Sequence, residues 1–201
     1  MFGPKFARHV ASRYRKRGLD KTAQRMVDWL VSQGVQGSTV LEIGGGVGEI
    51  QLELLRHGAA RTTNLELSSS YDDQAAALAN EAGVADRTVR RIGDVAADGA
   101  VAESADVVVM HRVICCYPDA DRLLGAAADH ARAMVVLSHP PGNVVARAVA
   151  AVENIGLRVM GREYRSFAHP PADLIATLRD HGFTAQHLHR GLLWHVIVAT
   201  R

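Results

Sequence analysis

Glycines and carboxylates are concentrated in one short stretch of the sequence, VLEIGGGVGEI at residues 40–50. A short apolar run leads directly into four glycines: Gly44, Gly45, Gly46 and Gly48. Glycine adopts positive φ without steric cost and lets a ligand approach the backbone closely. This spacing predicts a ligand-binding turn, and the side chains around the turn decide which ligand it accepts.

Two phosphate-binding patterns do not fit this turn. The P-loop pattern G-x-x-x-x-G-K-[ST] requires a lysine that the turn lacks. The dinucleotide pattern requires a glycine at its sixth position, and counted from Gly44 that position is Glu49. A pyrophosphate favours a positive helix end, whereas Glu42 precedes the glycines and Glu49 and Glu53 follow them. A cationic ligand therefore fits this turn better than a phosphate.

S-adenosylmethionine is a cationic ligand of this kind, because it carries a sulfonium and an ammonium group but no phosphate. The pattern E-x-G-x-G-x-G is matched by Glu42, Gly44, Gly46 and Gly48, with Gly45 as an additional glycine. On these residues, the chain from about residue 38 to residue 201 resembles the class I S-adenosylmethionine-dependent methyltransferases. The resemblance implies that the turn holds this cofactor.

Two further acids stand at the ends of the next predicted strands, Glu66 in TNLELSS and Asp94 in IGDVA. A carboxylate such as Glu66 can accept hydrogen bonds from both ribose hydroxyls. The resemblance implies that Asp94 meets the adenine amino group and that Val95 packs on the adenine ring. We include Leu67, directly after Glu66, among the predicted cofactor-binding residues. The predicted cofactor is S-adenosyl-L-methionine.

Two histidines are candidates for a general base. Methyl transfer is an in-line displacement, so the protein mainly aligns the nucleophile and excludes water. A base is required only if the nucleophile must lose a proton, and a neutral histidine suits that step near neutral pH. His139 ends a predicted strand and is our first candidate. His111 is the second, and the resemblance implies that it also borders the cofactor.

Three more histidines, His187, His189 and His195, lie near the C-terminus. Because His187 and His189 alternate, they could share one face of a strand. A metal site there would need a third convergent ligand, which the sequence does not identify. We therefore expect solvated or edge positions for these histidines and predict no metal site.

The stretch ICCYPD at residues 114–119 contains both cysteines, Cys115 and Cys116. We expect buried, reduced thiols, because adjacent cysteines make a poor structural disulfide. The stretch resembles IHYP of the magnesium-protoporphyrin O-methyltransferases, whose N-terminal segment also contributes a tyrosine near the cofactor. Tyr14 is the corresponding candidate here. Cys116 stands at that family's histidine position, and this departure speaks against a porphyrin carboxylate as acceptor.

Short β-branched runs alternate with amphipathic segments along the chain, which predicts a parallel sheet covered on both faces. Strands are expected at residues 39–44, 61–67, 88–94, 105–112 and 133–139, followed by two strands at 183–191 and 192–201. Helices are expected at about residues 49–57, 71–83, 120–131 and 171–182. The predicted fold is α/β, with a doubly wound, mostly parallel seven-stranded sheet and a C-terminal antiparallel hairpin.

The 201 residues predict one domain, with residues 1–36 as an N-terminal helical cap. The net charge is only +2, yet residues 1–25 hold eight Lys or Arg and one Asp. A helix ending near Leu30 could place Arg13, Arg15 or Arg17 near an acidic substrate. The same charges could bind RNA phosphates or face solvent. We expect residues 142–169, together with this helix, to cover the substrate.

The sequence thus predicts an S-adenosylmethionine-dependent methyltransferase acting on a small-molecule acceptor. An RNA methyltransferase that uses the basic N-terminal arm is an alternative, so nucleic acid is not excluded as a partner. A cofactor-binding protein without catalysis is another. We expect a cytoplasmic protein without a membrane span, because no apolar run reaches the length that a bilayer requires. The sequence leaves the oligomeric state open.

Overall fold

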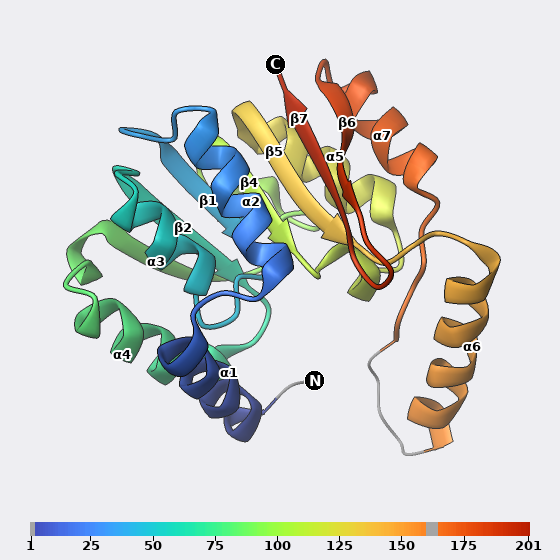
Figure 1. The fold of residues 1–201 in the computed structure, drawn as a ribbon, viewed down its shortest axis with the longest axis horizontal. Helices are drawn as coiled ribbons and strands as arrows, with labels where there is room; N and C mark the ends of the chain where they lie inside the picture. The colour runs from blue at the N-terminus through green and yellow to red at the C-terminus, as the bar shows by residue number, and fades with distance from the viewer. Residues whose placement is uncertain (1–2, 160–164) are drawn as a thin grey trace.

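The computed structural model describes residues 3–159 and 165–201, and these residues form a seven-stranded sheet (Figure 1). The strand order is β3-β2-β1-β4-β5-β7-β6. Five strands are parallel: β1 (Thr39–Ile43), β2 (Arg61–Glu66), β3 (Thr88–Ile92), β4 (Ala105–His111) and β5 (Ala131–His139). The strands β6 (Thr184–Arg190) and β7 (His195–Thr200) pair antiparallel, and β7 also pairs antiparallel with β5. The predicted fold class is confirmed.

The helices lie between these strands and before the first of them. Within the described residues, the α-helices are α1 (Pro4–Arg17), α2 (Lys21–Ser32), α3 (Glu49–Arg56), α4 (Asp72–Glu81), α5 (Ala120–His130), α6 (Val144–Val159) and α7 (Pro171–Asp180). Short 3-10 turns occur at Ser69–Tyr71, Ala85–Arg87, Gly99–Val101 and Ile114–Cys116. No helix among the described residues is long and apolar enough to cross a membrane.

Two hydrophobic layers enclose the sheet, one on each face. The helices α1 to α4 pack on one face, where Val107 and Val109 of β4 point. The helices α5 and α7 pack on the other face, against Val108 and Met110 of the same strand. Because both faces are covered, the central strands are continuous apolar runs rather than alternating ones. The layers leave the ends of the strands accessible, and the turns at the carboxyl ends meet along one edge of the sheet.

The N-terminal region differs from the single helix that the sequence predicts. It forms two helices, α1 and α2, which meet at an angle in Figure 1. Gly18 ends α1 with a φ of 67°, where glycine is favoured. Asp20 then caps α2, since its carboxylate accepts hydrogen bonds from the backbone N–H groups of Thr22 and Ala23. The sequence predicted a single helix because its apolar pattern continues across this break.

The segment expected to cover the substrate includes residues 160–164, which lie outside the described residues. Its first part is α6, which projects from the body of the protein in Figure 1 and carries exposed valines such as Val144 and Val152. Asn154 of α6 forms two hydrogen bonds with the backbone of Ser166, at 2.7 and 2.8 Å. Phe167 then donates its backbone N–H to the carbonyl of Cys115. The end of the segment therefore returns to the edge of the sheet where the turns meet.

Candidate functional site

A cavity of about 400 Å³ lies at the carboxyl ends of β1, β2, β3 and β4. Six of the predicted cofactor-binding residues line it: Gly44, Gly46, Glu66, Leu67, Asp94 and Val95. The other five do not: Tyr14, Glu42, Gly45, Gly48 and His111. The chain order of a parallel sheet thus brings the glycine turn and the two downstream acids together.

The shape of the glycine turn depends on its backbone conformation and on the side chains of Glu42 and Asn64, which pack closely against Gly45. Gly46 faces the cavity with a φ of 54°, which side chains disfavour. A Cβ on Gly45 would lie 2.7 Å from Cδ of Glu42 and 2.9 Å from Oδ1 of Asn64. Gly48 caps α3 in the left-handed conformation. Gly45 and Gly48 are therefore required by the shape of the turn, while Gly46 also presents its backbone to a ligand.

The carboxylate of Glu66 is held in place by backbone groups at the end of β2. Its Oε2 accepts a hydrogen bond of 3.0 Å from the N–H of Gly46. Its Oε1 accepts hydrogen bonds from the N–H groups of Leu67 and Ser68, at 2.9 and 3.3 Å. The arrangement joins the glycine turn to β2 and fixes a negative charge on the cavity wall.

Asp94 and Tyr117 form a second polar point on the cavity wall. Oδ1 of Asp94 accepts a hydrogen bond of 2.9 Å from the N–H of Ala96, and Oδ2 accepts one of 2.9 Å from the hydroxyl of Tyr117. Burial and the hydrogen bond to Asp94 raise the pKa of Tyr117, so its hydroxyl stays protonated at neutral pH. Val95, which is buried beside Asp94, supplies apolar wall.

The two acids that flank the glycines lie behind the turn rather than in the cavity. Glu42 is only 2% exposed. Burial, followed by the charge of Glu49, raises the pKa of Glu42 well above its usual value. Burial also raises the pKa of Glu49. The sequence alone attributes the preference for a cationic ligand to the acids that flank the glycines. The structure corrects this attribution, because the carboxylates that line the cavity are Glu66 and Asp94.

His111 lies behind the cavity wall, at the end of β4. Its Nδ1 is 2.9 Å from Oγ of Ser138, and its Nε2 is 3.4 Å from Oδ2 of Asp20. Burial lowers the pKa of His111, although Asp20 opposes this effect. Burial alone would raise the pKa of Asp20, but its contacts with His111 and the backbone hold the pKa well below its usual value. His111 is thus fixed between two partners rather than directed into the cavity.

Arg112, next to His111, does line the cavity. It is the one non-glycine residue with positive φ in the described part of the chain, at 57°. Its guanidinium forms an ion pair of 2.9 Å with Asp20 and lies over the ring of Trp194, 4.8 Å from the centroid. A strained backbone conformation persists only where contacts with the surrounding structure hold it in place, and such residues are common at functional sites.

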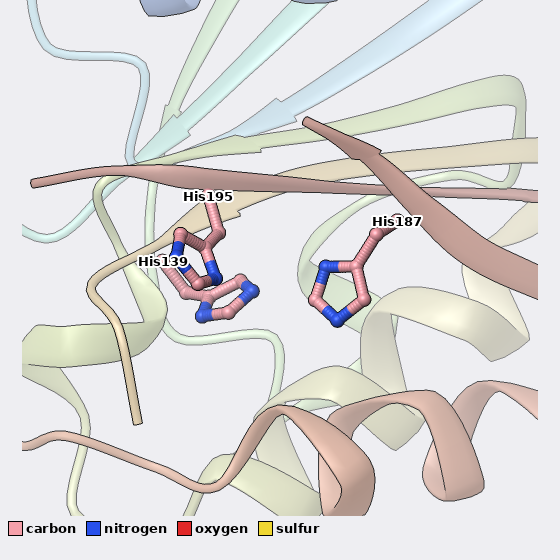
Figure 2. Close-up of side chains that lie close together, drawn as sticks. All are labelled: His139, His187 and His195. Atoms are coloured by element: carbon pink, nitrogen blue, oxygen red, sulfur yellow. The ribbon is translucent and has the colours of Figure 1, made fainter. Parts of the chain in front are cut away.

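His139 does not line this cavity. It is 1% exposed at the end of β5, and its Nδ1 is 2.8 Å from the carbonyl oxygen of Pro140. Its ring lies beside those of His187 and His195, with centroid distances of 6.0 and 5.3 Å (Figure 2). The third convergent histidine, which the sequence did not identify, is therefore His139. A role for His139 as general base stays a prediction.

Tyr14 packs on α3 and not on the cavity. Its hydroxyl donates a hydrogen bond of 2.7 Å to Oε1 of Glu53 and accepts one of 3.1 Å from Nη1 of Arg56. Burial and the hydrogen bond to Glu53 raise its pKa far above the usual value. These contacts anchor α1 onto the domain, and a contact of Tyr14 with the cofactor stays a prediction.

The basic residues of α1 have acidic partners within the protein. Arg13 lies 3.7 Å from Glu49, and Arg15 forms two hydrogen bonds of 2.7 Å with the carboxylate of Glu81. These ion pairs account for part of the charge imbalance at the N-terminus. They fix α1 to α3 and α4 and leave fewer charges for an RNA or an acidic substrate.

Several cavity residues were not named individually from the sequence, although Arg165 and Phe167 belong to the segment 142–169 that was expected to cover the substrate. Tyr71 lies opposite the turn, and a Cβ on Gly46 would be 3.7 Å from its ring. Arg165 and Phe167 enter the cavity from the segment after α6. Tyr117 belongs to the quoted ICCYPD stretch, so an aromatic residue after a strand end was an available signal. No local signal marks Phe167, because its place depends on a distant return of the chain.

Comparisons with known proteins agree with this geometry. The family model of the methyltransferase domain matches residues 9–188. No curated protein matches the chain by sequence. Among solved structures, a magnesium protoporphyrin IX methyltransferase from Synechocystis with bound SAH has a TM-score of 0.71 and 22% identity, covering 90% of this chain and 82% of that one.

Two O-methyltransferase family structures are also similar. The protein from Burkholderia thailandensis has a TM-score of 0.73 and 19% identity, and the match covers all of this chain (100%) and 63% of that one. The family 2 protein from Planctomyces limnophilus, in complex with apigenin, has a TM-score of 0.72 and 18% identity, with coverage of 100% and 62%. At these identities, the likeness concerns the fold.

Proposed function

Because the chain belongs to the methyltransferase domain family and is an S-adenosylmethionine-dependent methyltransferase, we propose that its cavity binds this cofactor and a small planar acceptor side by side. The observation that carries the proposal is the carboxylate of Glu66, which three backbone N–H groups hold on the cavity wall beside Gly46. The cavity volume of about 400 Å³ falls in the usual range for small-molecule sites.

The cavity residues fit the cofactor part by part. Glu66 would accept hydrogen bonds from the ribose hydroxyls, as a carboxylate fixed at this strand end can. Asp94 and Val95 would contact the adenine, with Leu67 beside Glu66. Gly44 and Gly46 would contact the methionine portion through the backbone. When bound, the cofactor supplies an electrophilic methyl group, and the protein orients it and excludes water.

The remaining cavity wall supports a planar aromatic or acidic acceptor. It combines two aromatic residues, Tyr117 and Phe167, with two arginines, Arg112 and Arg165. Arginine recognises carboxylates in a bidentate manner and also stacks on aromatic rings. Two structural neighbours are a magnesium protoporphyrin methyltransferase and a protein in complex with apigenin. Both of these molecules are planar and conjugated, which agrees with such an acceptor.

Of the two predicted bases, His111 directly precedes a residue that lines the cavity, Arg112. We assign His111 a positioning role. It contacts Asp20, which in turn forms the ion pair with Arg112. An acceptor that reacts as a carboxylate needs no base, because it is already ionised at neutral pH. His111→Phe removes the ring nitrogens that contact Ser138 and Asp20, so steady-state kinetics should show a larger rise in KM for an acidic acceptor than fall in kcat.

The first test is calorimetric titration with S-adenosylmethionine and with a nicotinamide dinucleotide. Glu66→Ala should bind S-adenosylmethionine about 10- to 150-fold more weakly, because it loses hydrogen bonds to a charged group worth about 1.5–3 kcal/mol. Glu103→Ala, at an exposed acid, is the matched control. Tight dinucleotide binding without S-adenosylmethionine binding, or unchanged affinity in Glu66→Ala, would overturn the assignment.

The second test asks what receives the methyl group. Transfer of labelled methyl to aromatic carboxylic acids and phenols, but not to RNA, is the expected outcome. Transfer to RNA would support the alternative, although the ion pairs of Arg13 and Arg15 with Glu49 and Glu81 count against a basic arm. Cofactor binding without transfer to any acceptor would support a non-catalytic protein. A cytoplasmic location, which the sequence predicts, belongs to the same proposal.

A further inference from the structure

Three histidines from three neighbouring strands converge outside the proposed cofactor cavity. His139 ends β5, His195 begins β7 and His187 lies on β6 (Figure 2). One ring nitrogen of each lies within 4.8 Å of the corresponding nitrogens of the other two. None of the three lines the cavity described above. The cluster is therefore a separate feature, created where the antiparallel hairpin joins the parallel sheet.

Each of the three rings has a buried nitrogen without a hydrogen-bond partner among the described residues. These atoms are Nε2 of His139, Nδ1 of His187 and Nδ1 of His195. Buried polar atoms in folded proteins nearly always have a partner, so each exception calls for an explanation. The three rings that carry these atoms form one cluster, so a single bound ion offers a common explanation for all three.

The surroundings hold these rings in the form that binds metals. The Nδ1 of His139, 2.8 Å from the carbonyl oxygen of Pro140, carries the ring proton, which leaves the lone pair on Nε2. Histidine ligands commonly donate their other N–H to a backbone carbonyl in this way. Burial lowers the pKa of His139 to about 4 and also lowers the pKa of His187 and His195.

The charge around the cluster selects the kind of ion. No carboxylate belongs to the cluster, and the positive charge of Arg190 acts on both His187 and His195. Hard cations such as Ca²⁺ and Mg²⁺ require oxygen ligands and are excluded on that ground. Imidazole nitrogen is a good ligand for zinc and its neighbours in the first transition series.

We propose that His139, His187 and His195 form a three-histidine site for a divalent transition metal, with Zn²⁺ as the expected ion. Zinc sites of this composition use three protein nitrogens at about 2.0–2.1 Å and leave a fourth position for water or another ligand. In a tetrahedral site the nitrogens are about 3.4 Å apart, so the rings must close in on the ion.

The required closure is available at the edge of the sheet. His187 lies on β6, the last strand in the sheet order, next to a register shift between His187 and His189. A bulge at an edge strand re-aims side chains and allows local adjustment. The bound ion would then join β6 and β7 to β5. Trp194 directly precedes His195 and contacts Arg112, which lines the proposed cavity. An ion bound to His195 would therefore also restrict the movement of this cavity wall.

The test uses the full chain after treatment with a chelator. Titration with Co²⁺ should show saturable binding of one equivalent, with the visible absorption bands of a tetrahedral nitrogen site, and Zn²⁺ should displace the Co²⁺. A thiolate-to-cobalt charge-transfer band would place the ion at Cys115 and Cys116 instead and would overturn the proposal. Absence of saturable binding would overturn it as well.

The variants His187→Ala and His189→Ala form a matched pair on the same strand, one inside the cluster and one outside it. His187→Ala should lose Co²⁺ binding and the rise in Tm with Zn²⁺, while His189→Ala keeps both. Far-ultraviolet circular dichroism establishes that each variant is folded before the titration. Equal loss in both variants, or retained binding in His187→Ala, would refute the site. None of these readouts depends on methyl transfer.

Discussion

Glu42 and Glu66 show how position decides what a carboxylate does in this protein. Both are predicted cofactor-binding residues on neighbouring strands. Glu66 stands at the end of β2, where backbone N–H groups hold its charge on the cavity wall. Glu42 stands one residue before the end of β1, inside the protein, where burial raises its pKa. The first is placed to bind a ligand, whereas the second supports the glycine turn.

The raised pKa of Glu42 predicts a pH-dependent stability. Its folded-state pKa exceeds the unfolded value, so the folded protein binds more protons above about pH 4.5 and stability falls as the pH rises. One such group changes the free energy of unfolding by up to about 1.4 kcal/mol per pH unit. Glu42→Gln should remove this contribution, so that urea unfolding between pH 5 and pH 8 shows a flatter profile.

The comparison for this prediction is Glu103→Gln, which replaces an exposed acid and should keep the pH profile of the native protein. If Glu42→Gln and the native protein lose stability equally over this pH range, Glu42 does not hold a proton in the folded state. The experiment is done without cofactor, because a cationic ligand would favour the ionised carboxylate.

At the scale of elements, features that depend on strand order are predictable from the sequence, and features that depend on the hairpin are not. Glu66 and Asp94 follow consecutive parallel strands, whose ends must meet at one edge. His139 meets His187 and His195 because β7 lies between β5 and β6, and His187 lies next to a register shift in β6. Neither fact has a local signature. The sequence indicated only that His187 and His189 could share one face of a strand, and it did not identify the contact with His139.

The break between α1 and α2 leads to a prediction about Asp20. This carboxylate caps α2 and also forms the ion pair with Arg112. Asp20→Asn should keep the cap and lose the ion pair, whereas Asp20→Ala loses both. Loss of a cap costs about 0.5–2 kcal/mol, so Asp20→Ala should be less stable than Asp20→Asn by about that amount in urea unfolding. Equal stabilities would show that the cap does not hold α2.

At the scale of the whole molecule, most of the core lies away from the proposed site. One hydrophobic layer reaches the cavity wall, at Ile43, Leu65, Val95 and Leu123. The two hydrophobic layers lie above and below the middle of the sheet, and the cavity lies at the ends of the strands. Substitutions of layer residues that do not line the cavity should therefore change mainly the stability of the protein, and substitutions of polar residues at the strand ends should change mainly what it binds. Leu137, which is fully buried in β5, and Glu66 represent the two classes.

This separation gives a prediction that two variants test together. Leu137→Ala should lower the free energy of unfolding by about 2–5 kcal/mol, because it leaves a cavity in the core. S-adenosylmethionine at about 100 times its Kd should return about 2.7 kcal/mol of stability to Leu137→Ala, as it does to the native protein. Glu66→Ala at that same concentration should gain much less. Urea unfolding with and without cofactor measures both increments, each against the same variant's own baseline.

Equal increments in Leu137→Ala and Glu66→Ala would mean that the strand-end carboxylate takes no part in binding. Loss of the increment in Leu137→Ala would mean that the core and the site are energetically coupled.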